Sequence, residues 1–92
     1  MDCKDFEYSN HCLLRIIERD INVDDIESVL KKGEIIKEYL DDEPYPSFLV
    51  LGFVDKKALH VVTAVYDETC IVITAYWADE EIWADGFRTK KK

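Results

Sequence analysis

The sequence has little basic charge, few glycines and no long apolar run, and each shortage excludes a class of protein. Twelve Lys and Arg residues stand against twenty Asp and Glu residues, which gives a net charge of -8. Such a charge repels nucleic-acid phosphates at long range, so only a local basic patch could bind RNA. Nowhere do about 20 apolar residues follow one another, as a membrane-spanning helix requires, and we expect no membrane partner. The three glycines are scattered, which excludes a glycine loop that cradles phosphates.

Cysteines are also few, and their number and spacing favour free thiols. Cys3, Cys12 and Cys70 are odd in number and lack the close paired spacing of zinc ligands. We therefore predict no disulfide, no metal site and no cofactor, with Cys12 and Cys70 buried. The first residues carry acids where a signal peptide needs positive charge before an apolar run, so we expect a cytoplasmic location.

What the chain does have is enough apolar material for one core. Its 92 residues are 48% hydrophobic and 35% charged, a composition typical of a globular protein. A chain of this length has material for a single core, so we predict one domain over residues 1–92, with its core in residues 8–83. Residues 88–92 end in three lysines and are expected to fray.

The first half of the sequence predicts two amphipathic helices. Ser9 can cap a helix that ends near Arg19, and its apolar residues form a stripe. Asn22 can cap a second helix, which the lysines before Gly33 and the glycine itself should end. The short connection predicts that the two helices form a hairpin.

The second half predicts strands. "EIIKEY" (residues 34–39) is typical of a short strand, and Ser47 to Trp77 of a three-stranded antiparallel meander. Strict alternation along its last two strands predicts which side chains face the helices: Leu59, Val61, Thr63, Val65, Ile71, Ile73, Ala75 and Trp77. Residues 78–87 should form a short helical turn that covers one edge of the sheet. The predicted fold class is α+β, an N-terminal helical hairpin packed on a four-stranded, mostly antiparallel sheet.

One pair of candidate site residues depends on the length of a turn. If residues 67–69 form a three-residue turn, His60 lies opposite Tyr76 on one face of the sheet. A two-residue turn would shift the register by one residue and separate them. A histidine with a pKa near neutrality beside a phenol is suited to proton transfer. The alternative is a core histidine, with a ring nitrogen bonded to a backbone group or a neighbouring hydroxyl.

A second set of candidates lies on the first helix. His11, Arg15 and Arg19 follow one another at four-residue intervals, so they share one helix face and form a basic row in an acidic protein. Guanidinium groups in such a row could hold a phosphate. The alternative is an ordinary polar surface, with His11 in solvent and the arginines paired with nearby acids such as Glu18.

The whole pattern resembles a known family. The row His11, Arg15, Arg19, then "DDIESVLKKGEIIKEY", "PYPSFLVLGF", "LHVV" and "ITAYW" are similar in order and spacing to the small prokaryotic family called domain of unknown function 4258, across about residues 8 to 83. The resemblance implies a RelE-like or barnase-like fold, a group in which two helices precede a four-stranded antiparallel sheet and many members are metal-independent ribonucleases or toxins. The polar positions that recur in the family correspond to a set of six residues here: His11, Arg15, Arg19, His60, Thr74 and Tyr76.

Two functions follow as hypotheses. The first is a RelE-like ribonuclease that cleaves RNA without a metal, with His11, Arg15, His60 and Tyr76 as catalytic residues. Arg19 and Thr74 would then bind the substrate. The second is a non-catalytic module whose sheet face binds a protein partner or a second copy of the chain.

Overall fold

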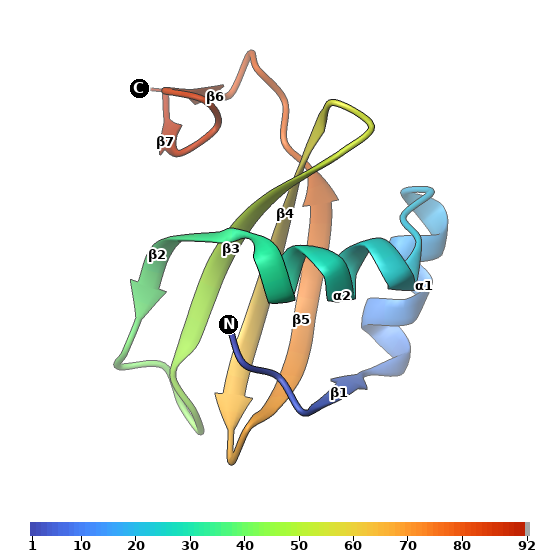
Figure 1. The fold of residues 1–92 in the computed structure, drawn as a ribbon, viewed down its shortest axis with the longest axis vertical. Helices are drawn as coiled ribbons and strands as arrows, with labels where there is room; N and C mark the ends of the chain where they lie inside the picture. Colours follow the sequence, from blue (N-terminus) through green and yellow to red (C-terminus); the bar gives the residue numbers. More distant parts are fainter. Residues whose placement is uncertain (92) are drawn as a thin grey trace.

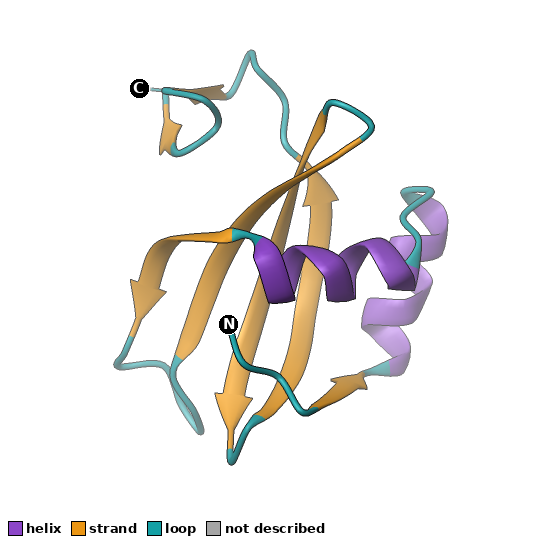
Figure 2. Cartoon of the chain, in the orientation of Figure 1, coloured by secondary structure: helices purple, strands orange, loops and turns teal. Residues whose placement is uncertain are grey.

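The computed structural model describes residues 1–91 as two helices packed on a five-stranded sheet, followed by a small hairpin (Figures 1 and 2). The elements follow in the order β1 (Asp5–Tyr8), α1 (Asn10–Glu18), α2 (Val23–Lys32), β2 (Glu34–Tyr39), β3 (Ser47–Val54), β4 (Lys57–Tyr66), β5 (Thr69–Trp77), β6 (Trp83–Ala84) and β7 (Thr89–Lys90). The α+β class is confirmed. The sheet has the strand order β1-β5-β4-β3-β2 and is mixed, so the prediction of four strands missed one. The RelE-like fold remains a prediction.

Both helices begin and end where the capping residues predict. The Ser9 side chain accepts a hydrogen bond from the backbone N–H of Cys12 at 3.0 Å, and the Asn22 side chain accepts one from Asp24 at 2.8 Å. Each bond satisfies a backbone donor that has no partner inside its helix. Gly33 ends α2, and a Cβ there would lie 2.5 Å from the backbone oxygens of Leu51 and Val29. Only glycine therefore lets the helix end so close to β3.

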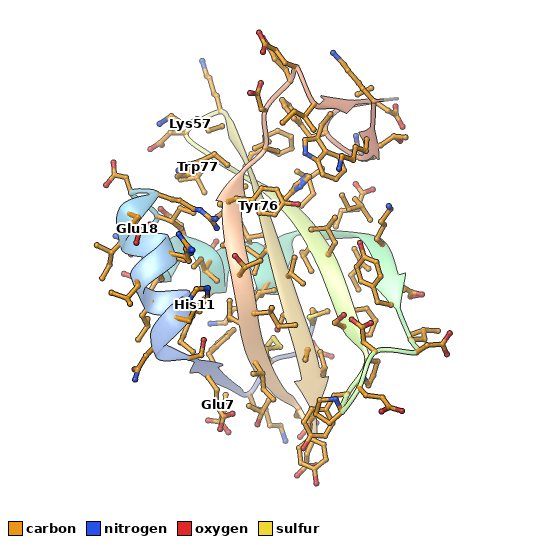
Figure 3. The ribbon with its side chains drawn as sticks, turned by 180° about the vertical axis from the view of Figure 1, so that it is seen from behind. Glu7, His11, Glu18, Lys57, Tyr76 and Trp77 are labelled. Carbon is orange, nitrogen blue, oxygen red and sulfur yellow. A yellow bond between two sulfur atoms is a disulfide. The ribbon has the colours of Figure 1, made fainter. Side chains whose placement is uncertain are left out.

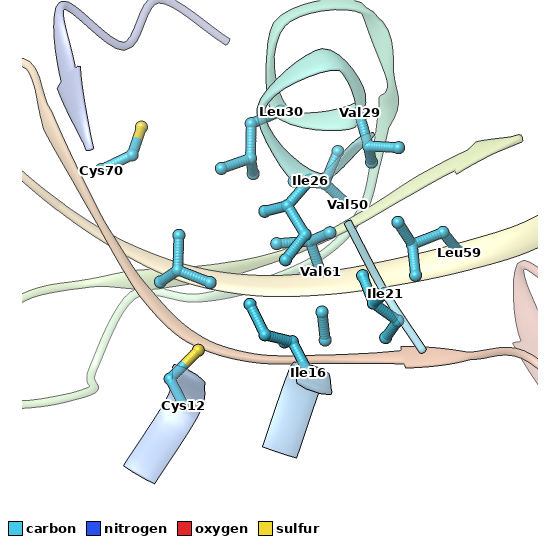
Figure 4. Packing of buried hydrophobic residues seen from close by; sticks show 12 residues of the cluster. Cys12, Ile16, Ile21, Ile26, Val29, Leu30, Val50, Leu59, Val61 and Cys70 are labelled. Atoms are coloured by element: carbon cyan, nitrogen blue, oxygen red, sulfur yellow. The ribbon is translucent and has the colours of Figure 1, made fainter. Parts of the chain in front are cut away.

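The helices cover one face of the sheet. Figure 1 shows α2 in front of the central strands and α1 beside β5. Figure 4 shows side chains of both helices meeting those of β3 and β4. The buried apolar cluster comprises Cys12, Ile16, Ile21, Ile26, Val29, Leu30, Val50, Leu59, Val61, Cys70, Val72 and Ala75. Burial of this apolar surface is the main force that holds the helices to the sheet.

The meander is confirmed, and its last turn is the two-residue alternative. Tyr66 pairs with Thr69, so the turn contains only Asp67 and Glu68, both with positive φ (49° and 66°). A two-residue turn of this kind matches the right-handed twist of the strands. By itself this turn would have separated His60 from Tyr76.

A β-bulge restores the register. Thr63 pairs with Val72 but the preceding Val62 pairs with Thr74, which leaves Ile73 as an extra residue in β5. His60 consequently pairs with Tyr76, as predicted, for a reason that differs from the predicted one.

Because of the bulge, the side chains of β5 that face the helices differ in part from those predicted. Cys70 and Val72 are buried and belong to the cluster beneath the helices, whereas Ile73 is 46% exposed. Strict alternation placed Ile71 and Ile73 toward the helices, and this was wrong because the extra residue reverses the phase of the strand before it.

The N-terminal strand and a disulfide were both missed. Strand β1 pairs with β5 in parallel, with Asp5 opposite Thr69 and Tyr8 opposite Val72. This pairing brings Cys3 to Cys70, and the two form a disulfide with a Cα–Cα distance of 5.5 Å. The prediction of three free thiols is therefore wrong for these two residues. Cys12 is a buried free cysteine, as predicted.

The C-terminal segment forms a hairpin where a helical turn was expected. Strands β6 and β7 pair only with each other, through Trp83 with Lys90 and Ala84 with Thr89. Residues 88–90, which were expected to fray, are ordered by this pairing and by an ion pair from Arg88 to Glu34. The final Lys92 lies outside the described residues. No helix in residues 1–91 is long and apolar enough to cross a membrane.

Candidate functional site

The pairing of β4 with β5 brings His60 and Tyr76 together. His60 Nδ1 lies 3.2 Å from Tyr76 Oη, and the two rings meet edge to face with centroids 5.3 Å apart. On its other side, His60 Nε2 lies 2.9 Å from the backbone oxygen of Phe87. A carbonyl oxygen can only accept, so Nε2 carries the proton in the neutral imidazole. Tyr76 therefore donates its hydroxyl proton to Nδ1.

The His60 side chain is completely buried. Its exposed fraction is 0%, and the Trp83 ring covers it edge to face with centroids 4.4 Å apart. Burial lowers the pKa of His60, and the bond to the Phe87 carbonyl opposes this shift in part. Burial likewise raises the pKa of Tyr76, with a smaller contribution from Tyr39. The pair therefore consists of a neutral imidazole and a protonated phenol near neutral pH.

A second pair joins Arg19, at the end of α1, to Thr74 of β5. Arg19 Nη1 donates to Thr74 Oγ1 at 3.1 Å and to the backbone oxygen of Ala75 at 2.9 Å. Trp77 Nε1 donates to the backbone oxygen of Arg19 at 2.9 Å, which ties the end of α1 to the end of β5. This is possible because the ladder between β1 and β5 ends at Val72 and leaves the next part of β5 for the helix.

The two pairs are neighbours along β5. Thr74 and Tyr76 are separated by one residue, and both lie beyond the bulge at Ile73. Alternation along a strand therefore places their side chains on the same side of the sheet. The hydroxyl and the phenol of β5 thus lie close to an imidazole from β4 and a guanidinium from the end of α1.

His11 and Arg15 are not part of this arrangement. Both are exposed on α1, and Arg15 Nη1 lies 3.2 Å from Glu18 Oε2, which is the ordinary ion pair that the alternative predicted. Figure 3 shows His11 on α1 beside β5, well away from Tyr76 near the end of that strand. No side-chain hydrogen bond in residues 1–91 joins either residue to the other four candidates, and the one link is the backbone N–H of Arg19, which donates to the Arg15 carbonyl within the helix.

Sequence reasoning missed the residues that cover the pair. Trp83 and Phe87 were expected to cover an edge of the sheet, and they cover His60 instead. The available signal was the aromatic content of the segment after Trp77, but nothing in its spacing indicates which strand it contacts. No group of three His, Cys, Asp or Glu residues within residues 1–91 could hold a metal ion.

A comparison with family models identifies the chain. The model described as "Domain of unknown function (DUF4258)" matches residues 8–77. The chain belongs to the DUF4258 family. Comparisons with curated proteins and with solved structures gave no match.

The range of the DUF4258 match includes the candidate site and excludes the hairpin that covers it. All six candidate residues lie inside the matched range, from His11 to Tyr76. The hairpin of β6 and β7, which supplies Trp83 and Phe87, lies outside it. The site and its cover therefore belong to different parts of this DUF4258 chain.

Proposed function

We propose that this protein is a metal-independent ribonuclease whose reacting groups are Tyr76 and His60. One observation carries the proposal. The Arg19–Thr74 and Tyr76–His60 contacts gather groups from three distant segments onto one stretch of β5. An anion-binding guanidinium beside a proton-transferring pair is the set of groups that RNA cleavage needs without a metal.

The chemistry follows from the proton positions. The 2′-oxygen of a ribose bonds to the adjacent phosphorus, and the bond from phosphorus to the 5′-oxygen breaks. The proton of the 2′-hydroxyl passes to Tyr76 Oη while the Tyr76 proton passes to His60 Nδ1. Water protonates the leaving 5′-oxygen, and the imidazolium returns its proton to solvent. The lowered pKa of His60 supports the first step, because the imidazole is already in its basic form at neutral pH.

Arg19 is suited to hold the phosphate. Its contacts with Thr74 and Ala75 use only Nη1, so the exposed guanidinium keeps further donors for an anion. Arg15 and His11 continue the basic row along α1 and would contact the next phosphates of the strand. His11 and Arg15 thus contribute to binding in this proposal, and the reacting groups are on the sheet.

The test is cleavage of mixed RNA in the presence of a chelator. Tyr76→Phe removes one oxygen from the reacting pair and should reduce cleavage by about 100-fold or more. Tyr66→Phe is the matched control, since Tyr66 is an exposed tyrosine in the neighbouring strand. Equal cleavage by both variants and the wild type would reveal a contaminant. The test also includes Trp83→Ala, which removes a ring that covers His60. The absence of cleavage by the wild type and by every variant would refute the proposal.

The second candidate is a protein-interaction module. Leu14 and Ile17 lie one turn apart on α1 and are 60% and 72% exposed. His11 and Arg15 flank them, so a partner segment with apolar side chains surrounded by carboxylates would fit this face. Light scattering distinguishes a dimer from a monomer, and Ile17→Ser should abolish any assembly that uses this face.

The location of the protein is a separate proposal. The Cys3–Cys70 disulfide favours an oxidising compartment, whereas the acidic start of the chain predicted the cytoplasm. Alkylation of thiols in freshly lysed cells distinguishes the two, because a cytoplasmic protein should show three reactive cysteines after denaturation and an oxidised one only Cys12.

A further inference from the structure

The covering of His60 raises the question of how a substrate could reach it. With an exposed fraction of 0%, the imidazole contacts no solvent in this conformation. Besides Tyr76, two groups that contact the imidazole come from one segment, residues 79–90: the Trp83 ring and the Phe87 carbonyl. The segment follows the strand that carries Tyr76.

This segment has few attachments to the rest of the molecule. Its strands form a separate two-stranded sheet, and two-stranded hairpins are marginally stable alone. Past Ala78, which donates to the Ala58 carbonyl at 2.9 Å, no backbone–backbone hydrogen bond among residues 1–91 joins it to the five-stranded sheet. Its remaining polar links are the His60–Phe87 bond and the exposed Arg88–Glu34 ion pair.

Two surface hollows also border the segment. One, of about 290 Å³, separates the turn before β4 from Asp79, Glu80 and Phe87. The other, of about 510 Å³, separates Arg88 from the end of α2 and from β3. Segments with few buried contacts open locally at a lower free energy than the packed core does.

The charge of the segment matches that of the proposed substrate. Four of its carboxylates are exposed: Asp79, Glu80, Glu81 and Asp85. The first of them follows Trp77 by two residues, and Trp77 contacts Arg19 at the end of α1. The Phe87 carbonyl accepts the His60 Nε2 proton in the position where a phosphate oxygen of RNA could accept it. The segment thus carries negative charge, as a nucleic-acid strand does, and it supplies the site with an acceptor oxygen.

We propose that residues 79–90 are an autoinhibitory lid, hinged after Ala78, that covers the His60–Tyr76 pair and must open before single-stranded RNA can bind. The autoinhibitory role of this lid rests on the proposed ribonuclease function. Its physical content, opening of the hairpin while the sheet stays folded, is independent of that function.

Modification of histidine by diethyl pyrocarbonate tests the lid, because the chain has two histidines and the exposed His11 is the internal reference. Mass spectrometry gives the rate at each residue. We expect slow modification of His60 that changes little at low urea concentrations, since a local opening exposes little surface. Glu34→Gln and Trp83→Ala should increase this rate severalfold relative to His11.

Glu68→Gln is the matched control, because it removes the Lys4–Glu68 ion pair at the other end of the molecule and should leave the His60 rate unchanged. Modification of His60 that rises steeply with urea in every variant would show that only global unfolding exposes it, and would overturn the lid. Modification through local opening, with no RNA cleaved by Trp83→Ala, would instead refute the ribonuclease and leave the moving hairpin in place. RNA cleavage unaffected by Trp83→Ala and Glu34→Gln would refute the autoinhibition.

Discussion

The two ends of the chain are held to the same sheet in opposite ways. The N-terminal end is bonded by the Cys3–Cys70 disulfide and continues the sheet as the parallel strand β1. The C-terminal end folds back as a hairpin that the side chains of His60, Glu34 and Phe53 hold in place, the last through an edge-to-face contact with Phe87. One end is fixed covalently and by backbone ladder bonds, whereas the other depends on contacts that can break singly. The comparison shows how one core can carry a permanent strand and a releasable cover.

The largest effect should come from the fixed end. The disulfide closes a loop with a sequence separation of 67 residues, and the loss of loop-closure entropy predicts that Cys3→Ser combined with Cys70→Ser lowers the free energy of unfolding by about 4 kcal/mol. Urea unfolding of the oxidised wild type and the variant measures this difference. The reduced wild type should match the variant. A loss below about 1 kcal/mol would mean that the ladder of β1 alone holds this end.

The releasable end is anchored on His60, so removing a partner of that residue should have the next largest effect. Tyr76→Phe leaves the buried Nδ1 without a donor, because the Phe87 carbonyl fixes the proton on Nε2, and should cost about 2 kcal/mol. Tyr66→Phe, at an exposed tyrosine, should change stability little. Equal stability of the two variants would show that the imidazole turns or finds another donor.

A smaller loss is expected from the cover itself. Trp83→Ala removes the edge-to-face contact with His60, which is worth about 1 kcal/mol. Hydrogen exchange should increase in residues 79–90 while the amides of β4 and β5 stay protected. Increased exchange throughout the sheet would mean that the hairpin is part of the cooperative core.

The buried imidazole also predicts a pH dependence. Since burial lowers the pKa of folded His60 below its usual value near 6.5, the unfolded chain binds more protons in the window beneath that value. Stability should therefore fall as the pH is lowered through about 6.5 toward the folded pKa. Unfolding in urea at several pH values should give a shallower dependence for His60→Gln, with His11→Gln as the control that keeps His60 in place. Identical slopes for His60→Gln and wild type would contradict the burial.

The smallest expected effect is a difference in coupling energy between two exposed ion pairs, one at each end of the chain. The Arg88 side chain contacts both carboxylate oxygens of Glu34, whereas the Lys4 side chain contacts one carboxylate oxygen of Glu68. A double-mutant cycle at each pair should give the larger coupling for Arg88–Glu34, because two parallel bonds fix the geometry. Both couplings should decrease as salt is added. A larger coupling at Lys4–Glu68 would reverse the expected order.

Much of the helical part could be predicted from the sequence, and much of the sheet's detail could not. Caps are local, so Ser9, Asn22 and Gly33 were sufficient to place both helices. The bulge at Ile73 leaves no local pattern, because any β-branched residue suits a strand, and only the pairing across the sheet shows that one residue is extra. The meeting of His60 with Tyr76 was confirmed although its stated condition, a three-residue turn, is not met.

The ends of the chain were the least predictable parts. Strand β1 alternates acids with aromatic residues, but over only four residues, which is too short to identify a strand. Its partner lies more than 60 residues away, so neither the pairing nor the disulfide had a local signal. The C-terminal hairpin turns at Asp85, Gly86 and Phe87, which all have positive φ. Asp-Gly is a common hairpin signal that the prediction of a helical turn passed over, whereas Phe87 is a type that seldom adopts positive φ. The convergence of Arg19 on Thr74 similarly depends on where β1 stops.

The buried Cys12 has a consequence for how the oxidised protein forms. Its thiol is buried between α1 and the sheet, and burial raises its pKa, so once the core has closed the thiol is protected from exchange with the Cys3–Cys70 disulfide. Before the core closes, Cys12 is nine positions from Cys3 in the chain and competes with Cys70 for the same partner. Collapse of α1 onto the sheet withdraws that competitor, so packing rather than proximity selects which two sulfurs remain joined.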